Sequence, residues 1–232
     1  MGGLIIKYPN QDYTEEYWWI GEDALAKDEC HHRYFVEMEI IDKIKENKEG
    51  YFDFNKNLVD IGACFGGYAV LLDFNHNYCF EPNKKFVCLI YTNMHIKNKI
   101  YNTDVYNCLL SDSKGVVRYN GWCCEGCGSP DEEHPFWGEM TETETKTLDS
   151  FDLDNIGLIK VDVEGFEEKV LRGGIGTIVR NNYPPILFEC WDVGYFGMTQ
   201  EKRDSMFNFL KSLGYEILEY WGDFETHLAI HK

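Results

Sequence analysis

The chain has little positive charge and no long apolar run. Its 232 residues include 22 Lys and Arg against 40 Asp and Glu, which gives a formal net charge of −18. Nucleic-acid binding needs clustered Lys and Arg, so this balance argues against a nucleic-acid substrate. No apolar stretch approaches the ~20 residues that span a bilayer. No signal peptide is visible at the start of the sequence, so we expect a soluble, cytoplasmic protein without a membrane span.

Several cofactor signatures are missing as well. The sequence has neither the G-x-G-x-x-G fingerprint of dinucleotide-binding folds nor the Gly-Lys-Ser/Thr of a phosphate loop. It also lacks the N/D-P-P-Y/F signature of amino-methylating enzymes, because Asn182-Tyr183-Pro184-Pro185 has the wrong order. The missing G-x-G-x-x-G fingerprint disfavours an NAD-dependent oxidoreductase.

Nine cysteines are present, but their irregular spacing does not indicate a disulfide framework. Most of them fall in apolar patterns and are interpreted as reduced core residues: Cys64, Cys79, Cys88, Cys108 and Cys190. In the segment 123–127, Cys124 and Cys127 have the spacing of metal ligands, and Cys123 or His134 would be further ligands. We interpret this segment as a glycine-rich loop that carries cysteines, with a zinc site as the alternative.

The most informative segment is 57–72. An apolar run suited to a buried parallel strand contains Asp60 near its end, and Gly62 and Gly66 open the turn that follows. A helical pattern comes next, from Tyr68 onwards. Glycines let a backbone approach a bulky ligand, so a strand, an acidic residue, a glycine turn and a helix together predict a nucleotide-type cofactor site.

A second strand pattern at 78–80 ends in Glu81 and Pro82. A carboxylate at this position accepts hydrogen bonds from both ribose hydroxyls, and S-adenosyl-L-methionine, with its sulfonium, amino group and ribose, fits these residues. The predicted cofactor contacts are Asp60, Gly62, Ala63, Gly66, Tyr68 near the methionine portion, Glu81, Pro82, and Ser111 and Asp112 near the adenine.

The remaining pattern predicts a single domain over 1–232. An N-terminal helical cap (1–50) precedes an α/β core (57–232) with an inserted loop at 121–144. Strand and helix signals alternate through the core: we expect one strand over 103–110, an added edge strand at 115–120, and a final hairpin. The predicted fold is a Rossmann-like class I methyltransferase, a seven-stranded mostly parallel sheet with an antiparallel last strand and helices on both faces.

The chain resembles the FkbM family of S-adenosylmethionine-dependent methyltransferases. The segments that carry the resemblance, in chain order, are 60–63 with Gly66, 80–83, 147–151, 159–167, 170–174 and 185–189. The family's usual asparagine after Gly-Ala is replaced here by Cys64. The resemblance implies O-methylation of a hydroxyl, with a sugar or glycan as the acceptor, and we interpret the chain as part of a larger glycan-synthesising polypeptide.

Methyl transfer to a hydroxyl needs a group that takes its proton. Glu164 or Asp162 is the candidate general base, oriented by Lys160 or a nearby imidazole, and His32 is a further catalytic candidate. In a variant mechanism, a divalent cation (Mg or Mn) held by Asp162, Glu189 and His227 lowers the pKa of the hydroxyl. The alternatives are a methyltransferase of a non-sugar small molecule and a catalytically inactive binding protein with the same fold.

Overall fold

The computed structural model describes residues 5–6, 17–18, 32–119, 141–195, 197–222 and 225–232. Its main sheet has seven strands in the order β11-β12-β10-β9-β3-β4-β5. Within that sheet β12 runs antiparallel to β10 and β11, whereas β4, β3, β9 and their neighbours pair in parallel. The predicted seven-stranded sheet with a reversed last strand is confirmed. The strand bounds are β3 (Asn57–Ile61), β4 (His76–Phe80), β5 (Thr103–Tyr106), β9 (Ile156–Val161), β10 (Ile186–Glu189), β11 (Tyr215–Leu218) and β12 (Thr226–His231).

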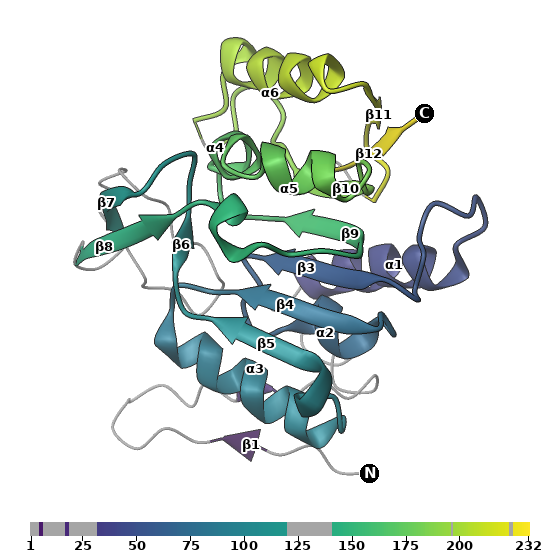
Figure 1. Ribbon diagram of the computed structural model, residues 1–232, viewed down its shortest axis with the longest axis vertical. Helices are drawn as coiled ribbons and strands as arrows, with labels where there is room; N and C mark the ends of the chain where they lie inside the picture. The colour runs from purple at the N-terminus through teal and green to yellow at the C-terminus, as the bar shows by residue number, and fades with distance from the viewer. Residues whose placement is uncertain (1–4, 7–16, 19–31, 120–140, 196, 223–224) are drawn as a thin grey trace.

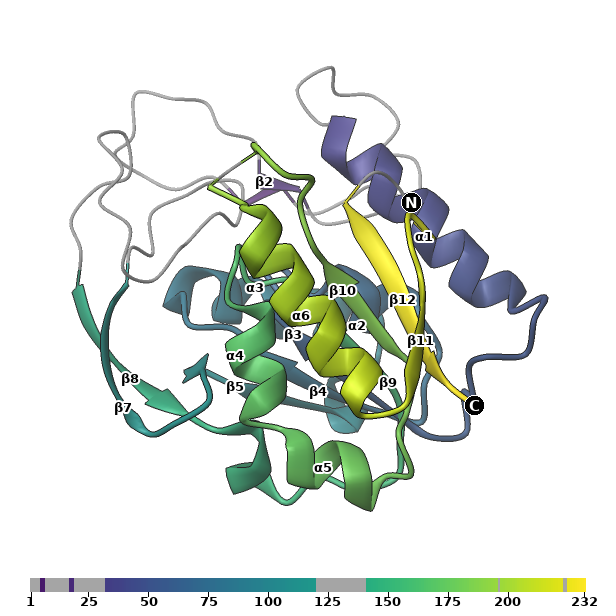
Figure 2. The same cartoon turned by 90° about the horizontal axis from the view of Figure 1, so that it is seen from above.

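Helices cover both faces of the sheet (Figures 1 and 2). On one face, apolar side chains of the sheet form a core with α1 (His32–Glu46), α2 (Gly67–Leu71) and α3 (Lys84–Ile96). On the other face they pack against α4 (Glu167–Arg172), α5 (Ile175–Arg180) and α6 (Gln200–Ser212). The two middle strands, β3 and β9, are buried at every position, as expected for parallel strands covered on both sides.

Two charged residues interrupt this apolar interior. Asp60 on β3 and Lys160 on β9 lie opposite each other in the register of the two strands, and both are buried. The sequence pattern places Asp60 at the strand end, and in the structure it is the residue before Ile61, the last residue of β3. A buried acid and a buried amine are stable here because each lies beside the other.

A second, three-stranded sheet corrects part of the sequence prediction. The predicted strand at 103–110 is two strands in different sheets, β5 and β6 (Leu109–Leu110). The predicted edge strand forms β7 (Gly115–Tyr119), which pairs with β8 (Thr141–Lys146) and not with the main sheet. The last four residues of the predicted loop 121–144 therefore belong to β8, whose sequence TETETK is too polar to predict a strand; residues 121–140 lie outside the described residues.

Much of the predicted N-terminal cap lies outside the described residues, as do the cysteine segment 123–127 and His134. Two-residue strands β1 (Ile5–Ile6) and β2 (Tyr17–Trp18) pair antiparallel, and α1 packs on the sheet through Ile40, Ile41 and Ile44. Short 3-10 helices, η1 (Ile100–Asn102) and η2 (Leu148–Phe151), complete the described elements. Among the residues that the structure describes, no helix has the length and apolarity needed to cross a membrane.

Candidate functional site

The parallel strands β3, β4, β5 and β9 end at the same edge of the main sheet, as Figure 1 shows. Ligands of open α/β sheets bind at this edge, in the crevice where the strands end. Many of the predicted site residues lie at the ends of β3, β4, β9 and β10 or on the segments that follow them.

The glycine turn (residues 62–66) connects β3 to α2. The backbone N–H groups of Gly62 and Ala63 both donate to the carbonyl of Phe80, at 3.0 and 3.1 Å, which ties the turn to the end of β4. Gly62 has φ +73° and Gly66 has φ +83°, a region that side chains disfavour. A Cβ on Gly62 would also lie 1.8 Å from the backbone oxygen of Asp162. The turn therefore packs directly against the segment that follows β9.

Glu81 lies where β4 ends, only 5 % exposed. Its carboxylate accepts hydrogen bonds from the backbone N–H of Cys64 (2.9 Å) and of Asn83 (2.7 Å). Burial raises the pKa of Glu81 to about 7, although both N–H donors favour the ionised form. Glu81 thus joins the glycine turn to the start of α3, whose first turn is capped by Asn83. It stands where the sequence predicts a ribose contact.

Ser111 and Asp112, the predicted adenine contacts, follow β6. The N–H of Ser111 donates to the carbonyl of Lys146 on β8, and a Cβ on Gly173 would lie only 2.1 Å from the carbonyl oxygen of Ser111. Closer to the end of β4, Asn107 follows β5 directly and donates from Nδ2 to the carbonyls of Glu81 (2.9 Å) and Pro82 (2.7 Å). The sequence did not single out Asn107, because the expected strand ran four residues too far.

Asp60 lies beneath the glycine turn. Its side chain is fully buried, and the nearest cation is Lys160, whose Nζ is 3.7 Å from Oδ1. Burial raises the pKa of Asp60, while the Lys160 charge opposes that rise. The Asp60 carboxylate has no exposed surface in this structure, and its contact with a cofactor stays a prediction.

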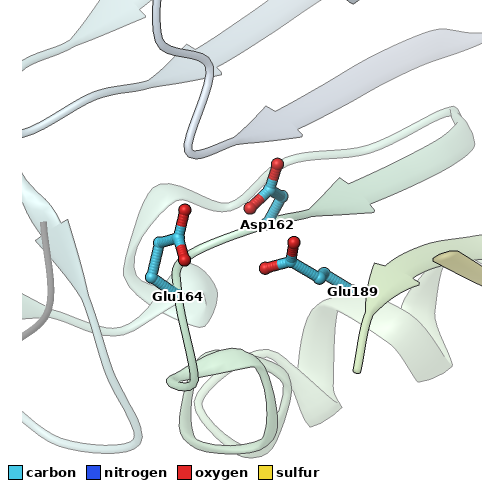
Figure 3. A group of neighbouring side chains, drawn as sticks. All are labelled: Asp162, Glu164 and Glu189. Atoms are coloured by element: carbon cyan, nitrogen blue, oxygen red, sulfur yellow. The ribbon is translucent and has the colours of Figure 1, made fainter. Parts of the chain in front are cut away.

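Three carboxylates converge beside the turn. Ligand oxygens of Asp162, Glu164 and Glu189 lie within 4.8 Å of one another, and we call these residues the acidic cluster. Figure 3 shows their side chains directed toward a common space, two from the segment after β9 and one from the end of β10. The predicted pair, Asp162 and Glu164, does come together, but not by sharing a strand face, because β9 ends at Val161.

The local backbone explains how Glu164 reaches the cluster. Glu164 has φ +57°, a left-handed conformation that costs a non-glycine residue about 1 kcal/mol. The buried carboxylate of Glu167 holds this bend by accepting hydrogen bonds from the N–H groups of Val163 (2.9 Å) and Gly165 (3.1 Å). Burial also raises the pKa of Glu167, to about 7. Glu167 therefore fixes the residues on both sides of Glu164.

A pocket of about 370 Å³, partly open solvent, lies between the acidic cluster and the face covered by α1 and α2. Its lining includes Asp162 and Glu189 together with Tyr68, Lys160, Glu225 and Thr226. The ring of Tyr68 lies 5.3 Å from Lys160 Nζ, so the predicted cofactor contact on α2 faces the same pocket as the acidic cluster.

The structure does not bring His227 to the acidic cluster. This histidine is fully buried on β12; its Nδ1 accepts from the N–H of Tyr220 (3.0 Å), and its Nε2 lies 3.0 Å from the carbonyl of Cys190. Burial lowers its pKa. Both ring nitrogens of His227 thus contact backbone groups. The third member of the acidic cluster is Glu164, where the sequence analysis named His227. His32 begins α1, and its side chain lies outside the described residues.

Comparison with known proteins identifies the family. The model of the methyltransferase FkbM domain matches residues 60–217, which is more than half of the chain. The chain belongs to the FkbM methyltransferase family. The match begins at Asp60 and ends in β11, so the glycine turn, Glu81 and the acidic cluster all lie inside this FkbM domain, whereas His32 and His227 lie outside it.

Solved structures share the fold of this FkbM domain. An FkbM methyltransferase from Methylobacillus flagellatus KT is 18% identical, with a TM-score of 0.55 over 78% of this chain. The match covers only 44% of that protein, so the chain spans less than half of its length. A candidate caffeoyl-CoA O-methyltransferase from Staphylococcus aureus is 12% identical, with a TM-score of 0.51 over 86% of this chain and 90% of its own. No curated protein sequence matches the chain.

Proposed function

We propose that this FkbM domain is an S-adenosylmethionine-dependent O-methyltransferase that acts on a hydroxyl of a sugar or glycan. The observation that carries the proposal is the acidic cluster beside the glycine turn: three carboxylates within 4.8 Å, next to a turn whose Gly62 packs on the backbone of Asp162. A proton acceptor thus lies next to the segment expected to hold the methyl donor.

The residues around the glycine turn fit S-adenosylmethionine. Bound there, it would supply a methyl group on a positively charged sulfur. The glycines allow the left-handed backbone that shapes this turn, and Glu81 offers a buried carboxylate for ribose hydroxyls. Tyr68, Asp162 and Glu189 line the adjoining pocket, where negative charge favours a cationic ligand group.

In the proposed mechanism, the carboxylate of Glu164 or Asp162 would take the proton of the acceptor hydroxyl while the oxygen bonds to the methyl carbon. The carbon–sulfur bond would break at the same time, with S-adenosylhomocysteine as the leaving group. Of the two we propose Glu164 as the base, held by the bend after β9, and Asp162 as the carboxylate that pairs with the Lys160 ammonium, 3.5 Å from its Oδ2. Glu167 keeps Glu164 in place during proton transfer.

A divalent cation is the second way in which these carboxylates would activate a hydroxyl. Oxygens of Asp162, Glu164 and Glu189 are the ligand type that Mg and Mn prefer, and their separation suits one ion. Such an ion would lower the pKa of the acceptor hydroxyl. Transfer that survives exhaustive chelation with EDTA would exclude this variant and leave Glu164 as the base.

Calorimetric titration with S-adenosylhomocysteine, with and without Mg or Mn, tests the cofactor first. We expect micromolar binding by the wild type and none by Glu81→Ala. A panel of sugars is then screened for methyl transfer, and Glu164→Gln should lower turnover by about 100-fold or more while binding stays intact.

Glu168→Gln is the matched control for Glu164→Gln. Glu168 lies on the neighbouring helix α4, where its carboxylate contacts Arg172 and Ser205 rather than the acidic cluster. This variant should keep wild-type turnover. Absence of any binding to the wild type would favour the inactive binding protein, and transfer only to a non-sugar hydroxyl would correct the acceptor.

A further inference from the structure

Lys160 is a buried cation in the middle of the apolar strand β9. All six positions of β9 are buried, and the Lys160 side chain is 7 % exposed. A buried ammonium is costly unless anions and carbonyl oxygens surround it. The groups around Nζ therefore show what this lysine holds in place.

Lys160 contacts both sides of the candidate site. Its Nζ donates to the carbonyl of Gly62 in the glycine turn at 2.9 Å. The same nitrogen lies 3.5 Å from Asp162 Oδ2 in the acidic cluster and 3.7 Å from Asp60 Oδ1 beneath the turn. One ammonium is thus shared by a backbone group that shapes the turn and a carboxylate on the opposite side.

Because one ammonium makes all three contacts, a change in one of them alters the other two. Asp60 and Asp162 compete for one positive charge, and the hydrogen bond to Gly62 holds Nζ between them. Removal of the Asp162 charge would draw Nζ toward Asp60, away from the carbonyl that it now holds. A change in the acidic cluster would then reach the glycine turn through Lys160.

We propose that Lys160 is a positioning residue that couples the glycine turn to Asp162, so that binding of the methyl donor and alignment of the acidic cluster depend on each other. The proposal rests on the proposed function, because it takes the glycine turn as the binding site of the donor. It requires that Asp162 influence donor binding through Lys160 and not only by direct contact.

The test is the effect of Asp162→Asn on the dissociation constant of S-adenosylhomocysteine, measured by calorimetry in four backgrounds. In the wild type we expect Asp162→Asn to weaken binding about fivefold or more, since residues that share one hydrogen-bond and ion-pair network are energetically coupled. In Lys160→Met, which keeps the apolar stem without the charge, the same change should alter binding by less than about twofold.

Lys160→Gln separates the two contacts and guards against misfolding of the methionine variant. Its amide can still donate to the Gly62 carbonyl but carries no charge, so binding should stay within about threefold of the wild type while sensitivity to Asp162→Asn is lost. Thermal unfolding of each variant confirms that it is folded.

Lys99→Met is the matched control. Lys99 makes contacts of the same kind away from the acidic cluster: Nζ donates to the carbonyl of Leu72 (2.6 Å) and pairs with Asp73 (3.0 Å). In this background Asp162→Asn should still weaken binding about fivefold.

Two outcomes would overturn the coupling: no effect of Asp162→Asn in the wild type, or an equal effect with and without the Lys160 charge. A wild type that binds no S-adenosylhomocysteine would instead refute the proposed function.

Discussion

The glycine turn and the acidic cluster lie against each other, but different contacts hold them in place. The turn is fixed mainly by backbone groups: Gly62 and Ala63 donate to Phe80, and Cys64 donates to Glu81. In the acidic cluster, side chains from separate segments converge, and Glu167 holds the bend at Glu164. The turn is therefore sensitive to added volume, whereas the acidic cluster is sensitive to the loss of single hydrogen-bonding groups.

The largest effect should come from Gly62→Ala, which adds a methyl group where the glycine turn packs against the backbone of Asp162. A Cβ would lie 1.8 Å from the oxygen of Asp162 at a φ of +73°. We expect S-adenosylhomocysteine affinity to fall about 100-fold or more and the free energy of unfolding to drop by about 3 kcal/mol. Calorimetry and denaturant unfolding measure the two losses.

Gly50→Ala is the control for the backbone part of this effect. Gly50 has a similar φ of +71°, but a Cβ there would meet nothing within 4 Å. It should cost about 1 kcal/mol of stability and leave binding unchanged. Equal losses in the two variants would show that backbone strain alone, and not the contact with Asp162, makes the turn sensitive.

Glu167→Ala should affect the acidic cluster and spare the turn. Without the carboxylate, the N–H groups of Val163 and Gly165 lose their acceptor, and Glu164 is no longer held in its left-handed conformation. We expect methyl transfer to fall about 10- to 100-fold, with S-adenosylhomocysteine affinity within about threefold of the wild type. Glu167→Gln, which keeps an acceptor oxygen, should lose less. If affinity fell as much as turnover, the effect of Glu167 on Glu164 could not be separated from an effect on the glycine turn.

The smallest effect is a pH dependence of donor binding. Burial raises the pKa of Glu81 to about 7, so its carboxylate, which we expect to accept ribose hydroxyls, is mostly protonated at pH 6 and mostly ionised at pH 8. S-adenosylhomocysteine affinity should therefore fall about tenfold from pH 8 to pH 6, as the ionised fraction drops to about a tenth. Calorimetry of Glu81→Gln should give a flat profile; the same slope in that variant would assign the pH dependence to another group.

The sequence predicted the glycine turn well because its elements are consecutive. The strand, Gly62, Gly66 and the helix follow one another, and their backbone needs are local. The strands at the edge of the α/β core were predicted less well. The strand expected at 103–110 divides between two sheets, and β8 was mistaken for loop because its TETETK sequence lacks apolar residues. As a result the sequence did not single out Asn107, which contacts Glu81 and Pro82, and the adenine contacts at Ser111 and Asp112 stay a prediction.

The acidic cluster was predicted in part and for a different reason than the structure shows. Strand alternation led to Asp162 and Glu164 as a pair, yet Glu164 reaches the cluster through a bend after β9 with φ +57°. The sequence analysis also named His227 as a candidate metal ligand. Its place in the core, with both nitrogens beside backbone groups, depends on the packing of β12 against β10, which no local pattern reveals.

By itself, the sequence determined the fold class and the position of the glycine turn, because alternating apolar segments and glycine spacing are local properties of the chain. Its short motifs, in their order along the chain, indicated the family. Only the tertiary structure decided which charges meet. Asp60, Lys160, Asp162 and Glu189 come from three strands or their ends, and their distances depend on strand order and register. Such long-range pairings produce no periodic pattern in the sequence. Each residue fits the local pattern of its own strand or loop, and it contacts its partners only when the sheet forms.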